Sequence, residues 1–307
     1  MIRQLRNALH RAIVAKETRL GERAWAGVPQ LDRDAAGAAI AGSIRAGRAF
    51  GVGKIGANEQ NLLHWAHGIA IPSLVPKPIF YYQTRYLATN AGIVPRSRAS
   101  YREFGRVLAD RVGGIDLLGT WSMPGERRLV QRFAKPGVLF THFLNFDPWF
   151  MAEPWSAALE GKRVFVVSPF ADSIERQMAR REAIFPGRKV LPPCSVTTFR
   201  FPYLVDPACS ETWQGVFEAV RREMDATDFD VALLGCGGLG LPLAAEAARR
   251  GKVGVHLGGM LQILFGIRGK RYDDSPPYAA MINEAWVRPS PEEIPPVADR
   301  IEERCYW

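Results

Sequence analysis

The chain has 307 residues, of which 47% are hydrophobic, so it can bury a substantial core as one large α/β domain or as two smaller ones. Its formal net charge of +9 suits nucleic acid, an anionic membrane surface or an anionic substrate, and does not choose among them. The four cysteines lack C-x-x-C spacing, which predicts reduced structural thiols and disfavours a zinc site.

The first part of the chain is predicted to be helical. Residues 1–20 place apolar side chains at helical spacing with arginines between them, and residues 32–46 are rich in alanine behind an acidic cap. The basic helix either packs on the body or lies on an anionic membrane surface. We expect neither a secretory signal nor a membrane anchor, and therefore a cytoplasmic protein with at most peripheral contact to the inner membrane face. The chain is divided into a helical extension over 1–48 and a main domain over 49–307.

From residue 49 onward, short apolar runs alternate with helical periodicity. Strands are predicted over 50–55, 115–118, 138–142, 164–167, 196–201, 231–234 and 253–256. Helices are predicted over 58–67, 84–90, 100–112, 125–133, 172–185 and 210–226, with a further helix after residue 240 and another near the C-terminus. This alternation favours an α/β fold with a mostly parallel sheet covered by helices on both faces.

The most informative stretch is residues 230–271, where a buried strand leads into a glycine-rich turn. Gly235, Gly237, Gly238 and Gly240 separate that strand from a helix. Because glycine has no Cβ, backbone amides and the positive end of the helix can approach an anion closely there. We therefore predict a phosphate site.

The glycine turn also matches the G-x-G-x-x-G spacing of dinucleotide-binding loops. However, the second strand ends in His256, where a nicotinamide-binding fold has an acid that holds the ribose hydroxyls. A nicotinamide or flavin dinucleotide, S-adenosylmethionine and a purely structural turn remain alternatives. His256 itself either binds a phosphate or ribose, orients another group, or is structural.

A second glycine turn and several polar residues follow His256. Gly258 and Gly259 form the turn, and Gln262, Arg268, Lys270 and Arg271 come directly after it. Cations beside a glycine loop suit a diphosphate, because they neutralise charge that builds up on the leaving group. A solvated basic turn is the alternative.

Glu59 is the best-placed carboxylate, because it lies in the first turn of a helix just beyond the end of a strand. Lys54, Gly56 and Asn58 lie beside it. One acid at such a position can hold Mn²⁺ or Mg²⁺ when phosphates supply the other oxygens, or it can simply favour the helix dipole. The chain has no zinc-ligand cluster, P-loop or nucleophile elbow, which disfavours zinc enzymes, ATPases and hydrolases.

Three further points concern a nucleic-acid partner, the general base and the oligomeric state. Aromatic residues interleaved with arginine over 81–86 suit stacking on bases, but no recognised nucleic-acid module accompanies them, so no nucleic-acid partner is expected. Asp147, Glu153, Asp172 and Asp273 are all conceivable general bases, and the sequence does not select one because a base is defined by its reach to the acceptor. Oligomeric state is likewise undetermined.

The segments GVGKIGANEQNLL (51–63) and LLGCGGLGLPLAAEAARRGKVGVHLGGMLQILFGIRGKR (233–271) resemble bacterial glycosyltransferases of the GT-D fold. The likeness is strongest to polysaccharide-cluster proteins that carry a C-terminal HLGG-x-x-Q-x-LFG-x-x-GKR signature. It extends to EGKRVFVVSPFADSIERQ, to NEAWVRP and to the terminal YW, which is expected to pack on the body, and it covers roughly residues 50–307.

This resemblance implies a Rossmann-like fold and a UDP- or GDP-sugar donor. It also implies a glycan or lipid-linked acceptor in surface polysaccharide or glycoconjugate synthesis. The family's D-x-E motif, which helps to hold a divalent metal and the donor, falls on Ala57-Asn58-Glu59, so the glutamate is kept and the aspartate is replaced by alanine. A non-catalytic protein that binds nucleotide sugars or glycans is therefore an alternative, and metal dependence is open.

The resemblance also implies roles for the residues singled out above. The loop 235–240 and the HLGG turn would surround the diphosphate, with Lys54, Gly56, Asn58 and Gln262 in the donor site. Glu59 would contribute to the donor or metal site, while Lys270 and Arg271 would stabilise the departing diphosphate. The two glycine turns and the Glu59 turn are expected to meet at one edge of the sheet.

Overall fold

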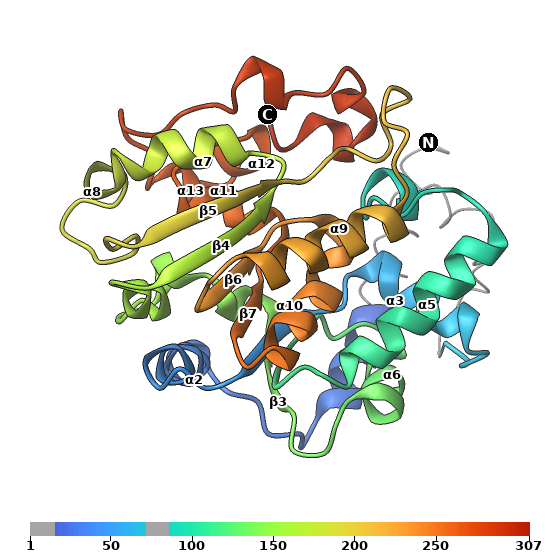
Figure 1. The fold of residues 1–307 in the computed structure, drawn as a ribbon. Coiled ribbons are helices and arrows are strands. Elements are labelled where there is room, and N and C mark those ends of the chain that lie inside the picture. Colours follow the sequence, from blue (N-terminus) through green and yellow to red (C-terminus); the bar gives the residue numbers. More distant parts are fainter. Residues whose placement is uncertain (1–15, 72–85) are drawn as a thin grey trace, which may run out of the picture.

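The computed structural model describes residues 16–71 and 86–307, and its centre is a seven-stranded sheet (Figure 1). The strands lie in the order β3-β2-β1-β7-β6-β4-β5, and every neighbouring pair is parallel. Their bounds are β1 Phe50–Lys54, β2 Leu117–Thr120, β3 Leu139–His142, β4 Arg163–Ser168, β5 Ser195–Arg200, β6 Val231–Leu234 and β7 Val253–His256. The predicted α/β fold is confirmed, and it is Rossmann-like.

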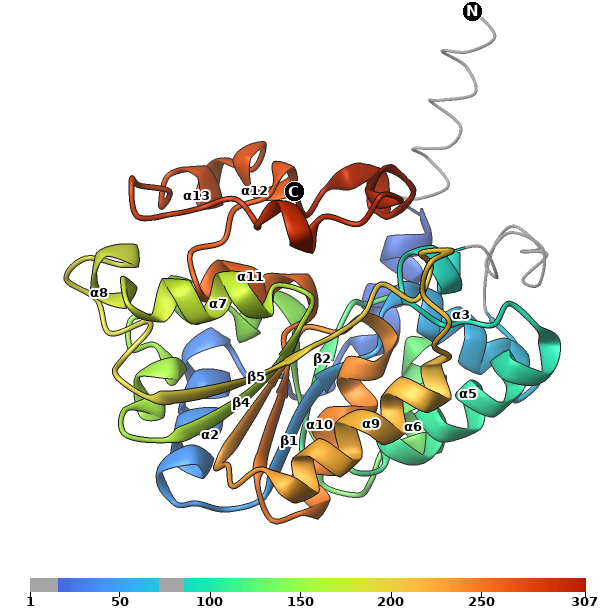
Figure 2. The ribbon, with the colours of Figure 1, turned by 45° about the horizontal axis from the view of Figure 1, so that its top comes forward.

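Helices cover both faces of this sheet (Figure 2). The longer ones are α2 Arg33–Arg45, α3 Ala57–Ala66, α5 Arg98–Val112, α6 Glu126–Phe133, α7 Ala171–Met178, α9 Trp213–Ala226 and α10 Gly240–Arg249. Short helices are α8 Arg181–Ile184, α11 Leu261–Leu264, α12 Lys270–Asp273 and α13 Pro276–Ala279, and residues 16–25 and 86–89 are also helical. Helices α3, α5, α9 and α10 pack on one face, whereas α2 and α7 pack on the other.

The strands supply both cores, because successive side chains of a strand point to opposite faces. In β4, Val164 and Val166 pack with α2 and α7, while Phe165 and Val167 pack with α9 and α10. Both faces of the central strands are buried, which explains why β4 and β6 are nearly continuous apolar runs, whereas the edge strands β3 and β5 are partly exposed. The predicted helix over 32–46 also joins this core, since its Ile40 is fully buried.

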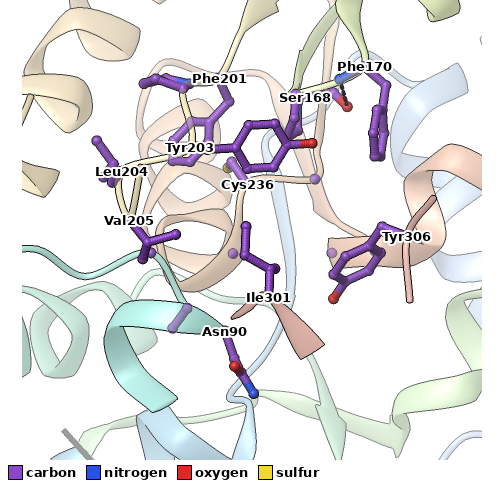
Figure 3. A pocket seen from close by; sticks show the side chains of 18 of the residues that line it. Asn90, Ser168, Phe170, Phe201, Tyr203, Leu204, Val205, Cys236, Ile301 and Tyr306 are labelled. Carbon is purple, nitrogen blue, oxygen red and sulfur yellow. Dashed lines mark hydrogen bonds between the residues drawn. The ribbon is translucent and has the colours of Figure 1, made fainter. Parts of the chain in front are cut away.

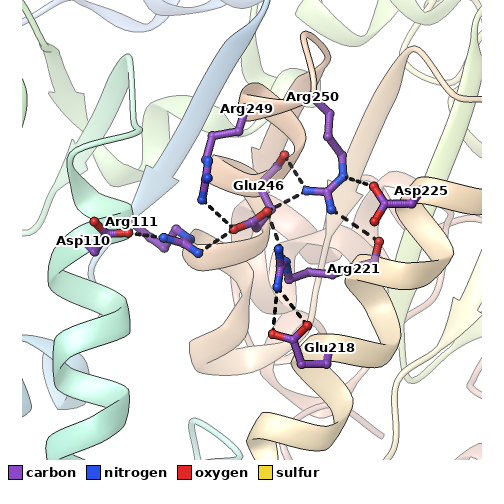
Figure 4. A network of polar contacts seen from close by, with 8 residues as sticks. All are labelled: Asp110, Arg111, Glu218, Arg221, Asp225, Glu246, Arg249 and Arg250. Carbon is purple, nitrogen blue, oxygen red and sulfur yellow. Dashed lines mark hydrogen bonds and ion pairs between the residues drawn. The ribbon is translucent and has the colours of Figure 1, made fainter.

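Helix α10, which follows the glycine loop, is anchored at its far end by a buried carboxylate (Figure 4). Glu246 is 1% exposed and pairs with Arg250 at 2.6 Å, Arg111 at 2.7 Å, and Arg221 and Arg249 at 3.3 Å. Burial acts to raise the pKa of Glu246, but these arginines outweigh burial and hold the pKa below its ordinary value. The network joins α5, α9 and α10 and so fixes the position of α10, the helix that begins at the glycine loop.

Two predicted helices are wrong. The helix expected over 172–185 is divided into α7 and α8, because Arg180 leaves the helical backbone with a φ of −112°. The tail forms short 3₁₀ turns at Pro291–Glu293, Ala298–Arg300 and Glu302–Arg304 in place of a helix. All three residues of the last turn have positive φ, between 45° and 62°, a conformation that a right-handed helix does not contain.

Some predictions fall outside the described residues. These are the basic start of the chain over 1–15, most of the proline-rich loop, and the start of the helix expected over 84–90. Within the part of the chain that the structure describes, no helix has the length and apolar character needed to cross a membrane.

Candidate functional site

Three loops meet at the carboxyl edge of the sheet, where β1, β7 and β6 lie side by side. The turn after β1 carries Glu59, the turn after β6 carries the glycine loop, and β7 ends in His256. A Cβ added to Gly238 would lie 3.2 Å from Glu59 Oε1, and one added to Gly56 would lie 2.5 Å from Glu59 Oε2. The Glu59 carboxylate therefore lies against both turns, and the expected meeting of these segments at one edge is observed.

These loops enclose a cavity of about 520 Å³, a size typical of small-molecule sites. Charged side chains stand in its wall, and it is called the polar cavity for that reason. The predicted site residues that line it are Lys54, Gly56, Asn58, Glu59, Gly237, His256, Gly258, Gly259 and Arg271. Its remaining walls come from the segment after β2, the start of the 3₁₀ helix Phe143–Phe146, the α12–α13 region and the C-terminal tail. Residues far apart in the sequence thus face one space.

Other predicted residues support the cavity from outside it. Gly238 and Gly240 lie behind the wall, and a Cβ on Gly240 would overlap the His256 ring at 2.2 Å from Cδ2. Gln262 is 1% exposed, and its Nε2 donates to the carbonyl oxygens of Ile267 at 3.1 Å and Tyr306 at 3.3 Å. Lys270 is exposed at the start of α12 and is not among the residues that line the cavity.

Lys54 ends β1 and is the deepest cation of the cavity. It is 9% exposed, and burial lowers its pKa to about 8, opposed by the Asp147 carboxylate and reinforced by Arg271. Asp147 is itself buried, which raises its pKa to about 6 against the attraction of Lys54. Tyr278 Oη donates to Asp147 Oδ2 at 3.0 Å and so holds this carboxylate beside the cavity.

Glu59 has an environment that disfavours its charge. Burial raises its pKa to about 7, a backbone hydrogen bond at Glu59 opposes this effect, and the nearby Glu302 carboxylate adds to it. A carboxyl group with this pKa changes protonation state near neutral pH. Such values recur in groups that exchange protons or bind charged ligands.

His256 is a neutral imidazole at physiological pH. Burial lowers its pKa to about 3, and the Lys54 ammonium lowers it further. Its ring packs against the backbone of Gly240, which leaves no room for a side chain there. His256 therefore positions the glycine loop through its shape and adds no positive charge to the cavity.

The C-terminal tail returns to the site and holds Arg271. The backbone N–H of Arg271 donates to the carbonyl of Cys305 at 2.9 Å, and its guanidinium lies 4.9 Å from the centre of the Tyr306 ring. The guanidinium also pairs with Glu302. Trp307 is 7% exposed, which confirms that the terminal YW packs on the body.

Sequence reasoning missed an aromatic wall of the cavity. The Trp121 and Phe143 rings stack with centroids 3.7 Å apart and planes 10° apart. The buried Glu126 carboxylate accepts hydrogen bonds from the backbone of Trp121 at 3.0 Å and of Met123 at 3.2 Å, which fixes this loop. Trp121 directly follows β2. Ligands of open α/β sheets bind beyond the carboxyl ends of the strands, and this strand-end rule, which selected Glu59, could also have found Trp121.

A second, smaller cavity of about 110 Å³ adjoins the first (Figure 3). Both are lined by Asn90, Gly237, Gly258, Gly259 and Tyr306, so the glycine turns form their common border. The smaller cavity extends over the carboxyl ends of β4 and β6. Its walls are mainly apolar and aromatic, and Gly235 and Gln262 line it.

The candidate bases and metal ligands are distributed as follows. None of Asp147, Glu153, Asp172 and Asp273 is among the described residues that line the polar cavity, whereas Glu59 is. The described residues contain no group of three or more histidine, cysteine, aspartate or glutamate side chains suited to a metal ion. Any cation there would need ligands from a bound substrate.

The fold and the cavity together define a Rossmann-like α/β protein with a polar site at the carboxyl edge of its sheet. Comparisons of the chain with protein-family models, with curated proteins and with solved structures found no match. The residues of the site, and the resemblance of its motifs to GT-D glycosyltransferases, are therefore the basis for a functional proposal.

Proposed function

We propose that the protein is a glycosyltransferase that moves a sugar from a UDP- or GDP-sugar to a glycan or lipid-linked acceptor in surface polysaccharide or glycoconjugate synthesis. The observation that carries the proposal is the convergence of Glu59, Lys54 and Arg271 with two glycine turns on one cavity. A nucleotide sugar needs such a mixture, because its diphosphate requires cations and backbone amides while its sugar requires polar contacts.

The diphosphate of the donor would lie over the border formed by Gly237, Gly258 and Gly259. Gly237 has a φ of +56°, and a Cβ there would lie 2.7 Å from the Ala91 carbonyl oxygen, so glycine is needed where the Ala91 backbone packs on the turn. The Gly238 N–H donates to that carbonyl at 2.8 Å, which fixes the turn beside the cavity. Helix α10 begins just beyond this turn and points its positive end toward it. Lys54 and Arg271 would neutralise the charge that develops as the glycosidic bond to the diphosphate breaks.

Glu59 is the carboxylate that would face the donor. With Ala57 at the first motif position, the carboxylates among the described residues that line the cavity are Glu59 and Glu302, and Glu302 is paired with Arg271. This donor set fits a cation held by Glu59 and by phosphate oxygens of the substrate. Such a cation, when bound, would supply further charge neutralisation for the diphosphate.

The acceptor would enter along the stacked Trp121 and Phe143 rings. This wall lies on the same cavity as Glu59 and presents aromatic surface against which the apolar face of a sugar ring can pack. The acceptor hydroxyl would then lie near Glu59. When no cation is bound there, this carboxylate, with a pKa of about 7, suits acceptance of a proton at neutral pH.

The proposal is tested by incubating the protein with radiolabelled UDP- and GDP-sugars and candidate acceptors, with and without Mn²⁺. Transfer or slow hydrolysis of one donor class supports the proposal. Ala57, which replaces the family aspartate, favours a second candidate, a protein that binds nucleotide sugars without reacting. Binding of a donor with neither transfer nor hydrolysis would establish that candidate, and stabilisation by NAD or S-adenosylmethionine alone would contradict both.

A further inference from the structure

We propose that the smaller cavity binds the nucleobase of the donor, so that the two cavities divide the nucleotide sugar between them. The inference rests on the proposed function. Because Gly237, Gly258 and Gly259 border both cavities, a ligand whose diphosphate crosses these glycines reaches into both spaces. Its sugar would lie beside Glu59 in the larger cavity, and its base would lie in the smaller one.

The charges of the two cavities support this division. The larger cavity is lined by charged side chains, among them Lys54, Glu59 and Arg271. The described residues that line the smaller cavity include no aspartate, glutamate, lysine, arginine or histidine. Burial raises the pKa of the Cys236 thiol in its wall, so this group is neutral as well. An uncharged base therefore suits the smaller cavity. Moving the charged phosphates out of water into this cavity would cost free energy, because no charged side chain there would pair with them.

The shape and composition of the smaller cavity fit a planar ring. Figure 3 shows the side chains of Tyr203, Val205, Cys236 and Ile301 around the cavity, and that of Tyr306 at its border. Aromatic and branched side chains of this kind suit the faces of a heterocycle. A volume of about 110 Å³ accommodates a compact ring system and is too small for the extended chain of a lipid-linked acceptor.

An unsatisfied polar atom supplies the second line of evidence. Gln262 lines this cavity and is 1% exposed, yet its buried Oε1 accepts no hydrogen bond within the described structure. Its Nε2 is already used by the Ile267 and Tyr306 carbonyls, so the acceptor is held in a fixed position. Buried polar atoms are nearly always paired. This oxygen is closed to solvent in the ligand-free structure, so an N–H on the edge of uracil or guanine would pair it once the wall of the cavity opens at this point.

The test fills the smaller cavity and leaves the larger one unchanged. Val205→Trp places a bulky ring in the wall, and Ala208→Trp adds the same ring at an exposed position of the same loop as a matched control. Calorimetry then measures binding of UDP, GDP and inorganic pyrophosphate to the wild-type protein and both variants. Val205→Phe replaces the first variant if its melting temperature shows that it does not fold.

We expect the wild type to bind UDP or GDP more tightly than pyrophosphate. Val205→Trp should weaken binding of that nucleotide at least about tenfold while changing pyrophosphate binding less than about twofold, and Ala208→Trp should change neither. Nucleotide binding to Val205→Trp that equals the wild type would overturn the inference and leave the proposed function intact. So would equal losses for nucleotide and pyrophosphate, or a wild type that binds the two equally. A wild type that binds no nucleotide would overturn both proposals.

Discussion

Two glutamates, the buried Glu246 and the half-buried Glu59, lie near opposite ends of helix α10 and have opposite environments. At the far end, Glu246 is surrounded by four arginines, and its pKa is held below the ordinary value. Beside the glycine loop, Glu59 lies against glycines, and burial raises its pKa to about 7. A buried charge whose partners are all in place is costly to disrupt, whereas a charge left without a strong partner is available to a ligand. The contrast is consistent with the proposal that a substrate binds at the glycine-loop end of the helix.

The largest expected effect is a loss of stability on changing Glu246, at the end of α10 where the carboxylate is paired with arginines. Glu246→Ala leaves four arginines without their shared carboxylate, so the free energy of unfolding should fall by about 3–5 kcal/mol. Glu218→Ala removes an acid on the exposed side of the same network and should cost less than about 1 kcal/mol. Urea denaturation measures both. Equal losses for the two variants would show that burial of Glu246 does not organise the network.

At the ligand end, Glu59→Gln should lower kcat/KM for the donor about 100-fold, because the carboxylate is removed with little change of shape. In the wild type, kcat/KM should rise with pH up to about 7 as Glu59 ionises and fall above about 8 as Lys54 loses its proton. The kcat/KM of Glu59→Gln should not show this rise with pH up to about 7. The exposed Glu182→Gln serves as the control, and a wild-type profile that is flat from pH 6 to 9 would contradict these assignments.

The same variant should become more stable than the wild type. The folded-state pKa of Glu59 lies above the unfolded value of 4.5, so the native state holds the proton more tightly, and the wild type loses stability as pH rises from 4.5 through 7. Glu59→Gln avoids this loss and should gain up to about 3 kcal/mol at pH 8 and almost nothing near pH 4.5. Thermal unfolding at the two pH values measures the difference. A variant less stable than the wild type at pH 8 would refute the claim that Glu59 is under-paired.

A smaller effect separates two neighbouring cations. Arg271 lines the polar cavity and Lys270 does not, so Arg271→Met should weaken UDP or GDP binding about tenfold while Lys270→Met should change it less than about twofold. Both substitutions remove one positive charge, so the pair controls for net charge. If Lys270→Met lost more UDP or GDP affinity than Arg271→Met, the diphosphate would lie on the Lys270 side of α12, which would contradict this prediction.

The sequence predicted much of the fold because the strands carry their own signal. Residues 231–234 and 253–256 are apolar runs bounded by turn residues, and the structure has β6 and β7 at those positions. The strand-end rule then placed Glu59 beside the glycine loop, because parallel strands end at one edge. Local pattern and global topology agree in this part of the chain.

Other parts of the site depend on tertiary contacts that spacing does not encode. Tyr306 and Glu302 reach the cavity because the tail turns through three residues of positive φ, and no local pattern predicts that path. Lys270 and Arg271 are adjacent in sequence, but successive residues of a helix point in different directions, and only Arg271 lines the cavity. The unpaired Oε1 of Gln262 is likewise visible only after folding.

The central claim is that the polar cavity binds a nucleotide diphosphate through charge that the fold leaves without a full partner. The most direct test is calorimetric titration of UDP- and GDP-sugars into the wild-type protein and into Lys54→Met, at pH 7 and low salt. The claim predicts that one donor class binds the wild type and binds Lys54→Met at least about tenfold more weakly. Binding that is equal in the two proteins, or the absence of binding to the wild type, would contradict it.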